Sequence, residues 1–131
     1  MSADLRVTMP NRPGILTKTF ESLAAAGVEV QGICGDLRPG ERWGYVHLLV
    51  DDAAPARKVL SDAGIEVVAE HEVDLVPMSG GAEGVLAATS PYAAEDRNLE
   101  VLYVAIDGRL VVGTEDMRKD RLGVKMKDAR Y

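Results

Sequence analysis

One stretch decides the fold of this chain: Leu5-Arg6-Val7-Thr8-Met9-Pro10-Asn11-Arg12-Pro13-Gly14-Ile15-Leu16. Its apolar side chains alternate with polar ones over the first five positions, as in a strand with one buried face. A polar turn follows, and Pro13 suits the first position of a helix because its ring already holds φ near the helical value. The stretch therefore predicts a strand, a tight turn and the start of an amphipathic helix.

The start of that helix is also the main candidate for a ligand site. Unpaired backbone amides in a first helical turn attract carboxylates and other anions, and Gly14 has no Cβ to obstruct a ligand. We expect the amides of Gly14, Ile15 and Leu16 to hold a carboxylate while the Asn11 side chain orients an amino group. Glu29 would hold that ammonium from the opposite side if two modules face each other. The alternative is structural, with Asn11 capping the helix and Gly14 only permitting close packing.

The residues that follow complete a βαββαβ unit. A helix over 13–26 ends at Gly27, and strands over 28–36 and 43–50 flank a turn at 38–41. Asp51 or Asp52 caps a second helix, which tolerates Pro55 in its first turn. Residues 65–78 form an extended stretch, one strand running into another near His71. Such a unit is an α+β, ferredoxin-like sandwich, with two helices on one face of a four-stranded antiparallel sheet.

The second half of the chain repeats the first faintly. Asp74-Leu75 matches Asp4-Leu5, and Gly84-Val85-Leu86 matches Gly14-Ile15-Leu16 at the same offset. A two-residue turn at Asp107-Gly108 predicts a hairpin, and Pro91 is expected to break the helix that starts at Glu83. The last helix shrinks to about 117–122, and the final strand is missing or reduced to 123–127. We therefore predict two tandem copies packed as a pseudo-dimer, with domains at 1–72 and 73–131.

Composition and charge exclude several classes of function. The formal net charge of −6 argues against a nucleic-acid-binding protein, and no apolar run approaches the length that spans a membrane. We expect a cytoplasmic protein. Cys34 is the single cysteine, so an internal disulfide is excluded. No spacing of His47 and His71 indicates a metal, and no nucleophile is paired with a base, so we expect neither cofactor nor enzymatic activity.

These residues resemble the ACT-domain family, small βαββαβ modules that bind amino acids and regulate metabolism. The resemblance rests on Asn11-Arg12-Pro13-Gly14-Ile15-Leu16, on Ala24-Ala25-Ala26-Gly27-Val28-Glu29-Val30 and on Leu49-Val50-Asp51-Asp52. Residues 72–124 resemble, more weakly, the partner half of tandem ACT proteins. In the family, effectors bind where the loop after the first strand faces a neighbouring module.

The resemblance implies a set of ligand-binding residues in each copy. In the first copy these are Asn11, Arg12, Pro13, Gly14, Ile15, Leu16, Glu29 and Val30. In the second copy the weaker set is Gly81, Gly84, Val85, Leu86 and Glu100.

One stretch indicates an interface. Residues 101–106 are apolar on both faces of their strand, and Trp43 and Tyr45 lie on a sheet face without a helix. We expect these faces to be covered by the other copy or by a second chain, giving a homodimer that packs through sheet faces or edges. The predicted function is an allosteric amino-acid sensor without catalysis. The alternative is a ligand-free regulatory or structural subunit that docks on a metabolic enzyme.

Overall fold

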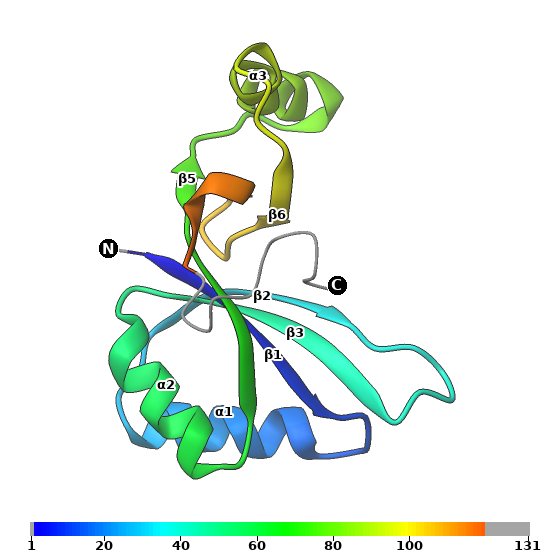
Figure 1. Ribbon diagram of the computed structural model, residues 1–131, viewed down its shortest axis with the longest axis vertical. Coiled ribbons are helices and arrows are strands. Elements are labelled where there is room, and N and C mark those ends of the chain that lie inside the picture. The colour runs from blue at the N-terminus through cyan, green and yellow to red at the C-terminus, as the bar shows by residue number, and fades with distance from the viewer. Residues whose placement is uncertain (1, 120–131) are drawn as a thin grey trace.

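The first part of the chain forms a sheet with two helices on one face (Figure 1). The computed structural model describes residues 2–119. In chain order the elements are β1 (Ala3–Pro10), α1 (Ile15–Ala25), β2 (Val30–Asp36), β3 (Trp43–Val50), α2 (Ala53–Asp62) and β4 (Glu66–Glu72). The strands lie in the order β2-β3-β1-β4, and each neighbouring pair is antiparallel. The predicted βαββαβ order is confirmed for this part of the chain.

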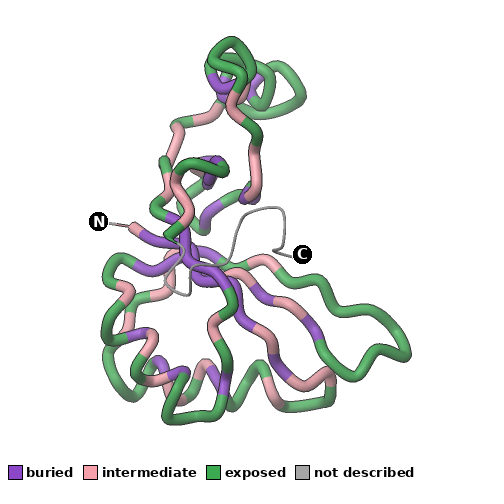
Figure 2. Tube along the Cα trace, in the orientation of Figure 1, coloured by how far each residue is buried: buried purple, intermediate pink, exposed green. Residues whose placement is uncertain are grey.

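Alternation along β1 separates the two faces of this first sheet. Leu5, Val7 and Met9 are buried in a core with Val46 and Leu48 of β3 and with apolar residues of both helices. Complete burial of one such side chain contributes about 1.5–3 kcal/mol. Buried residues accordingly gather along the centre of the sheet, while the hairpin between β2 and β3 is exposed (Figure 2).

The second part forms a smaller sheet with one helix. Its elements are β5 (Asp74–Val76), α3 (Gly81–Ala94), β6 (Leu99–Val104), β7 (Leu110–Thr114), a 3₁₀ turn (Glu115–Met117) and β8 (Arg118–Lys119). The second sheet has the antiparallel order β5-β7-β6. Ala88 and Tyr92 of α3 pack on Leu110 and Val112 of β7, so α3 covers one face of this sheet.

The other face of the second sheet packs on the first sheet. Leu49 of β3 shares a buried cluster with Val101, Tyr103 and Val111. In addition, the chain returns to the first sheet after β7, where β8 pairs with β4 as the fifth strand. The structure is therefore α+β with antiparallel sheets, as expected, whereas the division into two tandem copies at 72/73 stays a prediction.

The second sheet covers only one end of the first. Tyr45 lies beyond this contact and is half-buried, with the Arg6 guanidinium 4.0 Å from the centre of its ring. Trp43 keeps 56% of its surface exposed. Within the described residues the second half of the chain therefore does not cover this part of the sheet face, and its cover by a second chain stays a prediction. Among residues 2–119, no helix is long and apolar enough to span a membrane.

The expected helix break at Pro91 is wrong. The helix α3 continues through Pro91 to Ala94. Proline removes the bond to the carbonyl of Ala87, but both residues are exposed, so this carbonyl is accessible to solvent and not buried without a donor. The preceding turn gains two side-chain bonds, because Thr89 and Ser90 donate their hydroxyl hydrogens to carbonyls four residues earlier.

Three further boundaries differ from the prediction. Helix α1 begins at Ile15 and not at Pro13, because Gly14 adopts the left-handed conformation. The β6–β7 turn has three residues and not two, since the amide of Ala105 donates to the carbonyl of Arg109. A helix over 117–122 is contradicted at its start, where Arg118–Lys119 extend to pair with β4. Residues 120–122 and the expected strand at 123–127 lie outside the described residues.

Candidate functional site

Asn11 joins the predicted ligand loop to the hairpin between β2 and β3. Its backbone amide donates to the carbonyl of Arg42 at 2.8 Å. Its side-chain nitrogen donates to the carbonyls of Arg38 and Glu41, each at 3.0 Å. Both hydrogens of the amide group are thus used, which fixes the orientation of Asn11 and leaves its Oδ1 as an acceptor. Helix capping by Asn11 is wrong, because no side chain caps α1.

The start of α1 is open to solvent. Gly14 has φ 87°, and Arg12, Pro13 and Gly14 are all exposed. A Cβ built on Gly14 meets no atom within 4 Å, so close packing does not explain this glycine. The positive φ does explain it, since residues with a Cβ rarely adopt that conformation. The first helical turn, with the half-buried Ile15 and the exposed Leu16, therefore presents amides that no side chain covers.

Glu29 and Val30 lie at the opposite end of the first sheet. The register pairs Pro10 with Trp43 at one end of β3 and Val30 with Val50 at the other end. The length of β3, 8 residues, separates these ends by roughly 23 Å. Within one chain, the predicted residues 11–16 and 29–30 are therefore not brought together. They meet only if a second copy brings its own β2 to the loop.

The ligand-binding residues predicted for the second copy fall into two groups, one exposed to solvent and one engaged in contacts within the fold. Gly81, Val85 and Leu86 are exposed on α3. A Cβ on Gly84 would lie 1.7 Å from the carbonyl oxygen of Ser79, so close packing requires this glycine. The Glu100 Oε1 lies 2.8 Å from the His71 Nε2, in a hydrogen-bonding contact between the two sheets. Gly84 and Glu100 are thus engaged within the fold.

The structure also shows a buried polar contact that the sequence analysis missed. Asp4 is fully buried, accepts a hydrogen bond from the Tyr103 hydroxyl at 2.6 Å and lies 2.9 Å from the His47 Nδ1. Burial, and then the negative charge of Asp4, raise the pKa of Tyr103 above its usual value. Tyr92 behaves similarly, since burial and its hydrogen bond to Asp74 raise its pKa to about 12. Asp4 lies in β1, where polar and apolar residues alternate. No local sequence pattern distinguishes a polar strand residue that contacts another sheet from one that faces solvent.

A surface cleft of about 500 Å³ lies at the start of α2 and away from the predicted loop. It is lined by Ser2, Ala3, Asp51, Asp52, Ala53, Ala54, Glu70, Glu72 and Lys119. Carboxylates of this cleft act within the fold, and Glu72 among them lies 3.2 Å from Lys119. Asp52 caps α2 by accepting from the Ala54 amide at 3.3 Å, as predicted, and Glu70 pairs with Arg57 at 3.1 Å. In the part of the chain that the structure describes, no three His, Cys, Asp or Glu side chains form a group that would hold a metal ion.

Solved structures similar to this chain have the same fold. No family model and no curated protein matches the chain. The protein BT0572 from Bacteroides thetaiotaomicron aligns with a TM-score of 0.72 and 21% identity, over 88% of this chain and 80% of that one. The regulatory subunit of aspartate kinase from Thermus thermophilus, in its ligand-free form, aligns with a TM-score of 0.62 and 21% identity, over 86% and 82%. The corresponding subunit from Thermus flavus aligns with a TM-score of 0.60 and 21% identity, over 86% of this chain and 82% of that one.

Proposed function

We propose that this chain is a non-catalytic regulatory protein of the ACT-domain type, which binds an amino acid at the start of α1. The observation that carries this proposal is the uncapped, exposed start of α1 at Gly14, next to an Asn11 side chain whose orientation is fixed. The likeness to regulatory subunits of aspartate kinase supports a regulatory role. Such a protein acts in the cytoplasm, on a partner enzyme.

The chemistry of this site suits a zwitterion. The ligand carboxylate accepts hydrogen bonds from the amides of Ile15 and Leu16, at the positive end of the helix dipole. The competing bond from the Ile15 amide to the Arg12 carbonyl is long, at 3.4 Å, so a carboxylate displaces it easily. The Oδ1 of Asn11 then accepts from the ligand ammonium.

A second copy completes the site. Glu29 and Val30 of one chain lie too far from its own loop, so we propose that a homodimer brings them to the loop of its partner. Ligand binding then bridges two chains and favours one packing of the dimer over another. A partner enzyme would respond to that change in packing.

Calorimetric titration of the purified chain with each of the twenty amino acids tests the site. Gly14→Ala is the decisive variant and Gly64→Ala its control, because both glycines have positive φ and open space around the added Cβ. Backbone strain is therefore matched, and only Gly14→Ala places a methyl group against the ligand. We expect binding to weaken about tenfold, or 1.4 kcal/mol, in Gly14→Ala alone. Equal affinities of the two variants, or no binding by the wild type, would refute the proposal.

The exposed Trp43 favours a second candidate, a ligand-free subunit that docks on a metabolic enzyme. Tryptophan is enriched among residues that dominate binding energy. In that case an enzyme would co-purify in a fixed ratio, amino acids would leave the complex unchanged, and Trp43→Ala would release the enzyme.

A further inference from the structure

The cleft at the start of α2 is a candidate ligand site of its own, far from the loop at Asn11. Its volume of about 500 Å³ is typical of small-molecule sites. It lies beside Ala3, the first residue of β1, whereas Asn11 follows the last one. The 8 residues of β1 separate these two ends by roughly 23 Å. A ligand in the cleft would therefore bind apart from the proposed amino-acid site.

The charges that line the cleft favour a cationic ligand. Four carboxylates, those of Asp51, Asp52, Glu70 and Glu72, face the cleft together with one ammonium group, that of Lys119. The amide of Ala54, which could attract an anion to the start of α2, already donates to Asp52. The excess of negative charge repels an anion and attracts a cation.

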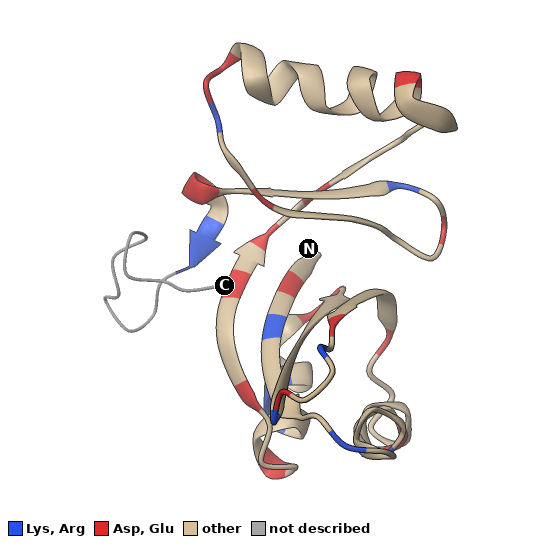
Figure 3. Ribbon diagram, turned by 90° about the vertical axis from the view of Figure 1, so that its right-hand side faces the viewer, with Lys and Arg blue, Asp and Glu red and all other residues tan. Residues whose placement is uncertain are grey.

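Lys119 shows which kind of cation the cleft accepts. Its Nζ lies 3.2 Å from the Glu72 Oε1 and 3.6 Å from the Glu70 Oε2. The Glu70 side chain is only 2% exposed, so water screens its charge weakly. The two-residue strand β8 brings Lys119 to this position, and Figure 3 shows β8 in blue next to red positions at the end of β4. The group bound between these two carboxylates is an ammonium ion at the end of an aliphatic chain.

The spacing of the carboxylates favours an extended cation over a metal ion. Ala3 pairs with Val50 on one side and with Glu72 on the other. Two strand spacings, roughly 10 Å, therefore separate Glu72 from the end of β3, which Asp51 and Asp52 follow. Among the residues that the structure describes, no three His, Cys, Asp or Glu side chains converge on a point where a metal ion could bind. A linear amine with an ammonium group at each end can reach both positions.

We propose that this cleft binds a linear aliphatic diamine or polyamine, with one ammonium group at Asp51 and Asp52 and another at Glu72. The methylene chain between them lies along the alanines of the lining, Ala3, Ala53 and Ala54. The ligand competes with Lys119 for Glu72. Because β8 pairs with β4 through only two residues, displacement of Lys119 weakens the contact through which the second half of the chain returns to the first sheet.

Calorimetric titration of the full chain with spermidine, at low ionic strength, tests the proposal. We expect saturable binding of one spermidine per chain. Butylamine, which carries a single ammonium group, and Mg²⁺ should each bind at least about tenfold more weakly. No saturable binding of spermidine, or an equal affinity for butylamine or Mg²⁺, would overturn the proposal. No amino acid takes part in this experiment, so its failure is distinguishable from a failure of the proposed function.

Two lysine variants test whether spermidine competes with Lys119. Lys119→Met removes the competing ammonium group and keeps an unbranched side chain, so spermidine should bind about fivefold more tightly. Lys58→Met is the matched control, because it removes the same charge from an exposed lysine that pairs with Asp62 outside the cleft. Its affinity for spermidine should match that of the wild type. Equal affinities of the two variants would show that only net charge matters and would overturn the proposal.

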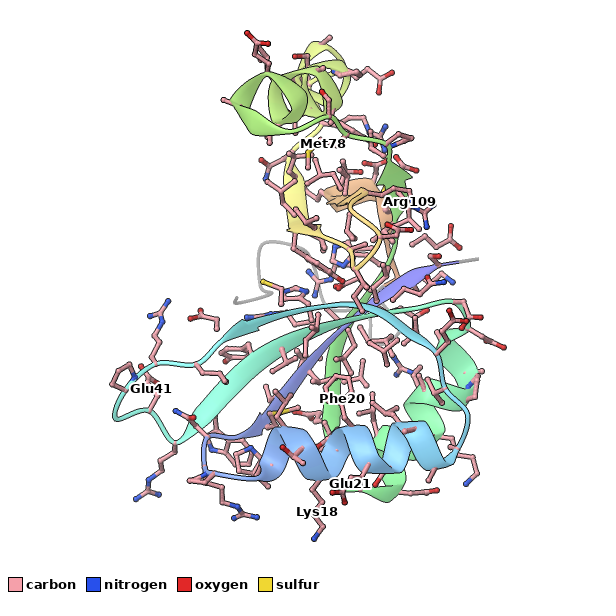
Figure 4. All side chains as sticks on the ribbon, turned by 180° about the vertical axis from the view of Figure 1, so that it is seen from behind. Lys18, Phe20, Glu21, Glu41, Met78 and Arg109 are labelled. Carbon is pink, nitrogen blue, oxygen red and sulfur yellow. The ribbon has the colours of Figure 1, made fainter. Side chains whose placement is uncertain are left out.

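Two glutamate variants locate the ligand independently of β8. Glu72→Gln should weaken spermidine binding about tenfold, because one of the charged partners is lost. Glu21→Gln is the control: Glu21 is exposed on α1 and points away from the sheet (Figure 4), and its variant should bind spermidine as the wild type does. Circular dichroism verifies that each variant is folded. The proposal fails if the two glutamate variants bind spermidine equally well.

Discussion

The hydrogen bond between Tyr103 and Asp4 provides the sharpest test of how the two sheets are held together. The Tyr103 hydroxyl donates to a fully buried carboxylate at 2.6 Å, across 99 positions of the sequence. Tyr103→Phe removes this donor and keeps the ring, which packs beside Gly32 on β2. The carboxylate retains His47 at 2.9 Å, so it loses one of its two side-chain partners.

The expected cost is that of a hydrogen bond to a charged group, about 1.5–3 kcal/mol of unfolding free energy. Urea denaturation followed by circular dichroism measures it, and the slope with denaturant should stay unchanged because both variants unfold the same surface. Tyr45→Phe is the control. Its ring stays beneath the Arg6 guanidinium, at 4.0 Å, and an aromatic ring without the hydroxyl keeps this contact. We expect the control to change stability by less than about 0.5 kcal/mol.

A double-mutant cycle assigns the effect to this pair. Tyr103→Phe in an Asp4→Asn background should cost clearly less than in the wild type, with a coupling energy of about 1–2 kcal/mol. The reasoning fails if Tyr103→Phe is no more destabilising than Tyr45→Phe, or if the two substitutions at Tyr103 and Asp4 are additive.

Two further predictions concern the second sheet and its helix. The pKa of Tyr92 is raised from 10.0 to about 12, so its bond to Asp74 stabilises the fold fully below pH 10 and is lost as the pH rises through 12. A pH series of urea denaturations should show this loss in the wild type and a smaller one in Tyr92→Phe. Gly84→Ala should destabilise by about 1–3 kcal/mol or more, because its Cβ would lie 1.7 Å from the backbone oxygen of Ser79. Gly80→Ala, with open space around its added Cβ, should match the wild type in the same denaturation assay, and equal losses in both variants would contradict this packing.

The side chains of the described residues also show where local reasoning was sufficient (Figure 4). Phe20 points from α1 toward the sheet, while Lys18 and Glu21 of the same helix point away from it. That division follows from helical periodicity alone. The cap at Asp52 was also predictable from local sequence, since its donor, the Ala54 amide, is only two residues away.

The candidate site was predictable only in part. Local rules identified the open start of α1, because the turn and the helix are determined by neighbouring residues. They misplaced the helix start at Pro13, because Gly14 adopts a left-handed conformation and the helix begins two residues later, at Ile15. The alternative in which Asn11 caps the helix is wrong, since its side chain donates instead to the carbonyls of residues 38 and 41 on another hairpin.

The sequence by itself determined the alternating strands, the two amphipathic helices of the first sheet and the order βαββαβ. These depend on periodicity and on contacts between residues close in the chain. Only the tertiary structure decided that Asp4 meets Tyr103, that β8 pairs with β4, and that Glu29 lies far from the loop at Gly14. Each of these depends on the register of strands and the packing of two sheets, which join residues far apart in sequence and leave no periodic pattern in it.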